Sequence, residues 1–178
     1  MNRISLREPL ASSSLRQLRD VWLALRDGRQ MPSRNDFDPI KIPGLLPQIA
    51  LTDVFYEPLR FRYRLIGTGI TAMSGRDATG RWLDEELYGD KTEKLLWTFR
   101  SCVERCEPVA VRQHALFPDR DWAMVEVLLM PMGETDDSIN VILSSVVPLK
   151  GEADRPMPDT SYLLDWRLGE VDDMHHSS

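Results

Sequence analysis

The chain has 178 residues, of which 42% are apolar and 28% are charged. These fractions lie close to the globular averages of ~45–50% and ~25%, which excludes a disordered or fibrous protein and predicts one folded domain. The formal net charge of −6 is opposite in sign to the basic surface of duplex nucleic-acid binders, so the sequence excludes nucleic acid as a direct partner.

The first predicted element is an amphipathic helix that ends at Gly28. Leu15, Leu18, Trp22 and Leu25 recur at spacings of three, four and three, which places them on one helix face. A stripe of this kind must be covered, either by the rest of its own domain or by a second copy of the chain. We therefore take the four residues as dimer-interface candidates, with packing inside the domain as the alternative.

A turn-rich segment and a β-hairpin follow. Prolines and small polar residues between 31 and 39 predict turns, and a short helix is expected around Ile40 to Leu46. Two runs with the pattern of β-strands follow, Ile49 to Tyr56 and Phe61 to Ile66. In the second run apolar residues alternate with arginines, which predicts a hairpin with one solvated face.

The strongest helix prediction covers Asp90 to Cys106. Asp90 and Glu93 have the spacing of a capping box, and the apolar residues that follow lie on one face. Pro108 then stops the helix. Three runs separated by polar turns predict an antiparallel meander: Val109 to Phe117, Trp122 to Met132, and Ile139 to Pro148.

These elements predict an α+β fold: a five-stranded antiparallel sheet with helices on one face and an amino-terminal amphipathic helix. We divide the chain into an amino-terminal helix and connector (1–36), the main domain (37–149) and an acidic, flexible tail (150–178). The tail carries a short apolar patch at 162–166, which could dock on the fold or on a partner.

The ordered series of motifs resembles the PAS domain superfamily, and in detail a stand-alone PAS-like family of alphaproteobacteria. The resemblance runs from about Leu15 to Leu149 and rests on the residues 22–29, 31–34, 38–39, 45–47, 61–70 and 75–81. It implies a twisted antiparallel sheet that encloses a small pocket with its flanking helices. In the superfamily, such pockets serve ligand sensing and the domains often dimerise, but the fold alone names no ligand.

Several residues could line such a pocket. Arg112 and His114 share one strand face, and an arginine there could bind a carboxylate or phosphate, whereas the alternative is a solvated outer sheet face. The remaining candidates could form apolar walls or belong to the ordinary core. The full set of pocket candidates is Tyr63, Met73, Trp82, Phe99, Arg112, His114 and Met124.

The cofactor is left unknown, but two classes are disfavoured. Covalent flavin photochemistry needs a reactive cysteine near 75–83, and this segment has none. Haem of the PAS type needs an axial histidine on the long helix, which also lacks one. Cys102 and Cys106 share a helix face, but buried helix cysteines are ordinarily apolar filler, so no metal site is predicted. His175 and His176 stand beside a Ser-Ser terminus and are as typical of a solvated tail as of ligands.

Location follows from what the sequence lacks. The most apolar stretch, 125–132, is interrupted by Glu126 and Pro131, so no membrane span is expected. Two cysteines and no signal-peptide pattern predict a cytoplasmic protein.

The sequence thus predicts a bacterial, non-catalytic sensory or regulatory domain that binds a small ligand, or signals through dimerisation or a partner protein. A homodimer is expected. One alternative is a structural dimerisation adaptor without a ligand. A second is a small α+β enzyme that uses His114 and a nearby carboxylate, for which His114 must lie in the pocket.

Overall fold

A mixed β-sheet organises the molecule. The computed structural model describes residues 2–117, 119, 123–151 and 159–169. Within these residues the sheet has seven strands in the order β1-β7-β4-β5-β6-β2-β3. The strands are β1 (Asn2–Ser5), β2 (Ile49–Phe55), β3 (Arg60–Ile66), β4 (Val109–His114), β5 (Met124–Met132), β6 (Val141–Pro148) and β7 (Thr160–Leu164).

The five central strands confirm the predicted antiparallel sheet. β2 pairs with β3, and β4 pairs with β5 and β5 with β6, as the two hairpin patterns indicated. β2 joins the first hairpin to the other strands by pairing antiparallel to β6, with Ile49 opposite Ser145. The prediction of five strands was nevertheless too low, because β7 adds antiparallel to β4 and β1 adds parallel to β7.

The helices are α1 (Ser13–Arg26), α2 (Thr68–Ser74), α3 (Glu85–Tyr88) and α4 (Thr92–Arg105). Ser12 caps α1, because its hydroxyl accepts a hydrogen bond from the Leu15 backbone N–H at 3.3 Å. The capping box expected for α4 is wrong: Lys91 occupies the cap position without a side-chain bond, and a single turn, η4 (Gly89–Lys91), precedes the helix.

The short helix expected around 40–46 is also wrong. Single 3₁₀ turns take its place, η2 (Pro39–Lys41) and η3 (Leu46–Gln48), after η1 (Arg34–Asp36). Closely spaced prolines explain the difference, because each removes a backbone donor and prevents a longer run of helical hydrogen bonds.

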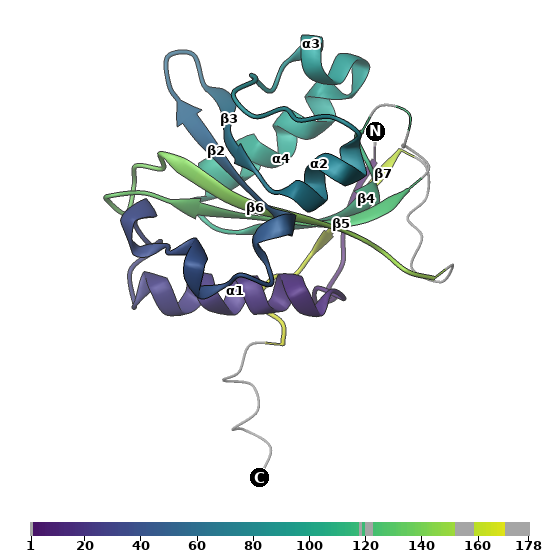
Figure 1. Cartoon of the computed structure of the whole chain (residues 1–178). Helices are drawn as coiled ribbons and strands as arrows, with labels where there is room; N and C mark the ends of the chain where they lie inside the picture. The colour runs from purple at the N-terminus through teal and green to yellow at the C-terminus, as the bar shows by residue number, and fades with distance from the viewer. Residues whose placement is uncertain (1, 118, 120–122, 152–158, 170–178) are drawn as a thin grey trace.

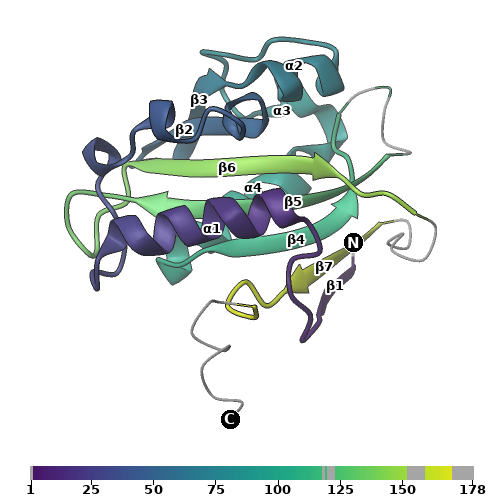
Figure 2. The same cartoon turned by 60° about the horizontal axis from the view of Figure 1, so that its bottom comes forward.

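Helices cover both faces of the sheet. α2, α3 and α4 lie on one face, whereas α1 lies on the other, across β5 and β6 (Figures 1 and 2). Trp22 anchors α1 there, because its indole N–H donates to the Pro131 carbonyl of β5 at 2.8 Å. The expectation that the flanking helices lie on one face holds for α2–α4, while α1 makes the fold a three-layered one.

The carboxyl-terminal segment contributes to this packing. Residues 160–164, expected in the tail, form β7, and Trp166 is buried after it. The buried Arg19 of α1 donates to the carbonyls of Trp166, Leu168 and Gly169, which fixes the segment against the helix. No helix in the described ranges is both long and apolar enough to cross a membrane.

Candidate functional site

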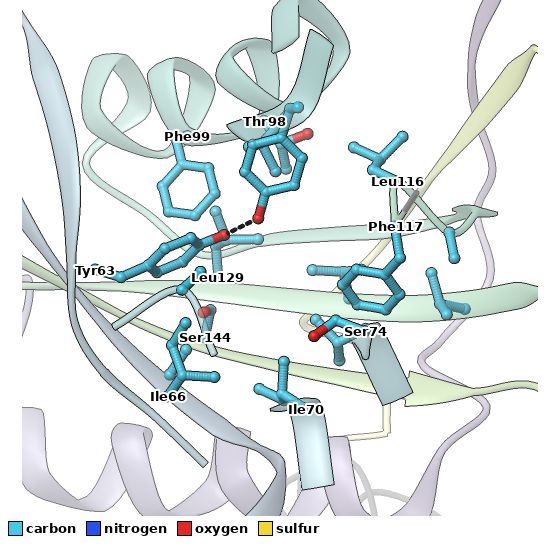
Figure 3. Close-up of a pocket in the computed structure, with 18 of the residues that line it drawn as sticks. Tyr63, Ile66, Ile70, Ser74, Thr98, Phe99, Leu116, Phe117, Leu129 and Ser144 are labelled. Carbon is cyan, nitrogen blue, oxygen red and sulfur yellow. Dashed lines mark hydrogen bonds between the residues drawn. The ribbon is translucent and has the colours of Figure 1, made fainter. Parts of the chain in front are cut away.

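A cavity of about 80 Å³ lies between the sheet and the helices α2 and α4 (Figure 3). Strand alternation explains its apolar wall, because every second residue of β5 faces this side. The cavity is lined by Ala50, Tyr63, Ile66, Ile70, Ser74, Arg76, Ala78, Tyr88, Leu95, Thr98, Phe99, Gln113, Ala115, Leu116, Phe117, Val125, Val127, Leu129, Ser144 and Val146.

A tyrosine pair forms the main polar feature of the cavity. The hydroxyls of Tyr63 on β3 and Tyr88 on α3 are hydrogen-bonded at 2.5 Å (Figure 3). Burial raises the pKa of Tyr63 well above its ordinary value of 10.0, and it also raises the pKa of Tyr88. Both phenols therefore stay protonated at neutral pH and keep their hydrogen-bonding protons.

Five further polar residues line the cavity: Ser74, Arg76, Thr98, Gln113 and Ser144. Gln113 accepts a hydrogen bond from the Ser161 hydroxyl at 2.8 Å. Arg76 donates to the Leu87 carbonyl and places its guanidinium carbon 5.5 Å from the Tyr88 ring centroid. Ser144 is buried, and its hydroxyl makes no hydrogen bond to any residue that the structure describes.

An outer groove of about 630 Å³ adjoins the cavity. Phe117 and Val146 line both spaces, so they mark the place where cavity and groove meet. In Figure 3, Phe117 lies on the side of the cavity away from Tyr63. The groove is lined by Pro47, Gln48, Gly69, Ala72, Met73, Phe117, Ala123, Met124, Val146, Pro148, Leu149 and Gly151.

The structure distributes the predicted pocket residues over three places. Tyr63 and Phe99 line the cavity, whereas Met73 and Met124 line the outer groove. Trp82 lies outside both described linings, where its ring packs 5.2 Å from Phe55 and beneath the guanidinium of Arg60 at 3.8 Å. The interpretation of Trp82 as a pocket wall is therefore wrong.

Arg112 and His114 do not face the cavity. Their strand neighbours Gln113 and Ala115 line it, and the alternation of β4 turns the two predicted residues to the opposite face. There Arg112 contacts the carboxylates of Glu8 and Glu126 at 3.2 and 3.3 Å. Both are corrected from pocket residues to outer-face residues, and the alternative enzyme loses the pocket histidine that it required.

The predicted dimer stripe is core instead. Leu15, Leu18 and Trp22 are at most 1% exposed within the single chain, and Leu25 is half-buried against the same core. The stripe is covered by the sheet, because the amphipathic pattern of α1 is satisfied by packing on β5. The assignment of these residues to a dimer interface is therefore corrected.

Neither cysteine contributes to the described cavity lining. Cys102 is buried in the core of α4, and burial raises the pKa of its thiol. Among the described residues, no group of three histidine, cysteine or acidic side chains is placed to hold a metal ion.

Six polar lining residues escaped the sequence reasoning: Ser74, Arg76, Tyr88, Thr98, Gln113 and Ser144. For Gln113 a signal existed, because strand parity with Arg112 and His114 puts it on the other face. The other residues lie on different elements or loops of the chain, and no local pattern indicated that these would meet at one cavity.

A comparison with known protein families identifies the family of the chain. Residues 10–147 match a family described as PAS domain. No curated protein matches the chain.

Several solved structures resemble the chain, among them the following three. The structure "Flavin Analogue Sheds Light on Light-Oxygen-Voltage Domain Mechanism" is 12% identical with a TM-score of 0.47, over 65% of this chain and 86% of the other. A Rhodobacter sphaeroides LOV protein is 15% identical with a TM-score of 0.46, over 66% and 72%. A sensory box sensor histidine kinase from Vibrio cholerae is 12% identical with a TM-score of 0.42, over 62% and 88%.

Proposed function

Because this chain belongs to the PAS domain family, we propose that it is a non-catalytic sensory or regulatory domain that binds a small molecule in its cavity. The observation that carries this proposal is the cavity itself, which combines an apolar wall with buried hydroxyls at Tyr63, Tyr88 and Ser144. An apolar space with a few convergent polar groups is typical of ligand sites. In a core without a ligand site, buried polar groups are normally paired with one another.

The ligand would be held without a covalent bond. The described lining residues include tyrosine, serine, threonine, glutamine and arginine, but neither cysteine nor histidine. Hydrogen bonds and apolar contacts are the interactions that these side chains offer. This supports a reversibly bound molecule rather than a histidine-ligated haem or a cysteine-linked flavin.

We further propose that the signal leaves the domain by contact with another protein, either a second copy or a different chain. The homodimer stays part of this proposal, but the α1 stripe no longer argues for it, because Leu15, Leu18 and Trp22 are buried inside the chain. An output surface must therefore be sought among exposed side chains.

Native mass spectrometry of freshly purified, untagged protein, compared with denaturing mass spectrometry, tests the ligand proposal. We expect extra mass that disappears on denaturation, and the same spectrum gives the oligomeric state. Ala115→Phe, which adds a ring at a buried lining position, should lose the extra mass. The variant must keep its circular dichroism spectrum for this comparison to hold.

Two outcomes would count against a ligand in the cavity. Extra mass that is equal in the wild type and in Ala115→Phe would place the molecule elsewhere. Wild-type protein without extra mass would favour the alternative function, a structural adaptor that works without a ligand.

A further inference from the structure

We propose that the cavity and the outer groove form one elongated binding site for an aliphatic carboxylate. The carboxylate would lie at the cavity end, beside Tyr63, Tyr88 and Arg76, and the chain would pass between Phe117 and Val146 into the groove. This inference rests on the proposed function, and it names the ligand class that the same cavity accepts.

The tyrosine pair has one hydrogen-bond donor to spare. Two phenol hydroxyls carry two protons, and the bond between Tyr63 and Tyr88 uses one of them. No further hydrogen bond joins either hydroxyl to a residue in the described part of the chain. The remaining O–H therefore needs an acceptor in the cavity, and a carboxylate oxygen is one.

The charge of the lining favours an anion. Arg76 lines the cavity beside Tyr88, and the described lining contains no aspartate or glutamate to neutralise it. Its guanidinium has five N–H donors, of which one donates to the Leu87 carbonyl. Charge-assisted hydrogen bonds from the others would favour a carboxylate over an alcohol or an amine.

The cavity end of the path is small, and the groove beyond it is uncharged. The cavity of about 80 Å³ is well below the ~300–1,000 Å³ of ordinary ligand pockets, so a ligand must be thin or extend beyond it. Beyond Phe117, the described groove lining carries no charged side chain and includes Met73 and Met124. Methionine side chains adapt to flexible apolar ligands, which suits an alkyl chain.

Isothermal titration calorimetry with straight-chain carboxylates, from hexanoate to dodecanoate below their micelle concentrations, tests the class. Each methylene that becomes buried should raise the affinity about fourfold until the groove is filled. At equal chain length, the carboxylate should bind more tightly than the alcohol, and the alkyltrimethylammonium ion should bind least.

Two matched pairs of variants test the placement. Arg76→Gln should weaken the carboxylate about tenfold or more and leave the alcohol unchanged, whereas Arg81→Gln, outside the lining and paired with Glu86, should change neither. Val146→Phe should block the passage to the groove and abolish the gain with chain length, whereas Val146→Ala should keep it.

A third variant guards against misfolding of Arg76→Gln, whose side chain also holds the end of α3 through Leu87. The double variant Tyr63→Phe/Tyr88→Phe removes both hydroxyls, and with them the spare donor, and keeps the guanidinium, so the carboxylate should bind several-fold more weakly to it.

The outcomes separate this inference from the proposed function. Equal affinity for carboxylates and alcohols, with both lost in Val146→Phe, would overturn the carboxylate and keep the cavity as a ligand site. Binding that Val146→Phe leaves unchanged would overturn the location. If no member of the series binds while the native protein retains a mass that Ala115→Phe loses, the ligand class is wrong and the proposed function stands; without such a mass both fail.

Discussion

The two faces of the sheet differ in how their interiors are packed. Beneath α1 the sheet is covered by buried side chains, and the charged side chains Arg19 and Glu126, both 0% exposed, each make several hydrogen bonds. Beneath α2–α4 the interior keeps a cavity, and a buried hydroxyl and a tyrosine proton have no partner among the described residues. The α1 face, here called the closed face, is covered by packed side chains, whereas the α2–α4 face, the cavity face, leaves space for a ligand.

The α1 face joins three distant segments through one carboxylate. Glu126 on β5 accepts hydrogen bonds from the backbone N–H groups of Ala11 and Ser12 at 3.1 and 2.8 Å, and from Arg112 at 3.3 Å. These bonds fix the start of α1 over the sheet and link it to β4. A buried charge is tolerated only with such a set of partners.

The difference between the two faces supports placing the proposed ligand on the cavity face, between the sheet and α2–α4. A buried polar group without a partner costs free energy, so folded proteins retain few of them. Buried polar atoms without a hydrogen-bond partner occur on the α1 side as well, at Arg112 Nε and Trp166 Nε1, so the cavity face is distinguished by its open space and by the spare tyrosine proton that points into it.

The largest expected effect is the loss of the charge at the centre of the closed face. Glu126→Ala leaves Arg112 and two backbone N–H groups without their buried acceptor, so the free energy of unfolding should fall by about 3–5 kcal/mol. Urea unfolding followed by circular dichroism measures the change.

Glu93→Ala is the matched control, because Glu93 pairs with Arg100 on the exposed side of α4. Its cost should stay below about 1 kcal/mol, as for other exposed ion pairs. Equal losses in Glu126→Ala and Glu93→Ala would show that the buried carboxylate does not hold the closed face together.

The next effect compares the same truncation on the two faces. Leu18→Ala, at 1% exposure on α1, should cost about 2–5 kcal/mol, because it opens a void in close-packed surroundings. Leu95→Ala on α4 should cost roughly half of that or less, because this side chain is half-buried and already borders the cavity. Unfolding in urea compares the two, and an equal cost would contradict the difference in packing.

Much of the fold could be predicted from local patterns. The alternation in β3 and the turns between β4, β5 and β6 produced the central antiparallel sheet, and the stripe on α1 identified the side that is buried. The stripe could not say what buries it, because periodicity shows that a face is covered but not by which surface. The dimer interpretation of Trp22 failed for this reason.

Long-range pairing accounts for the other misses. β1 is exposed and mostly polar, and its partner β7 lies more than a hundred residues away, so neither strand carries a local signal of the other. The cavity was anticipated through Tyr63 and Phe99, but its polar end joins Tyr63 to Tyr88 on another element. Only the three-dimensional structure brings these hydroxyls together.

The smallest effect concerns that tyrosine pair and its pH dependence. Tyr63→Phe leaves the Tyr88 hydroxyl without its partner, which should cost about 1–3 kcal/mol at neutral pH. In the wild type, burial raises the pKa of Tyr63 in the folded state well above the ordinary value of 10.0, so the folded protein keeps a proton that the unfolded chain releases. The contribution of Tyr63 to stability is therefore fully present below pH ~10 and is lost as the pH rises further toward the folded-state pKa.

Removing the phenol should flatten this alkaline loss. Above pH ~10 each group of this kind lowers the free energy of unfolding by up to about 1.4 kcal/mol per pH unit, so Tyr63→Phe should fall less steeply than the wild type. Urea unfolding from about pH 8 to about pH 11 compares the two slopes. Parallel slopes would mean that Tyr63 ionises as readily in the folded protein as in the unfolded chain, and the cavity would then be open to water rather than an apolar space that keeps its phenols protonated.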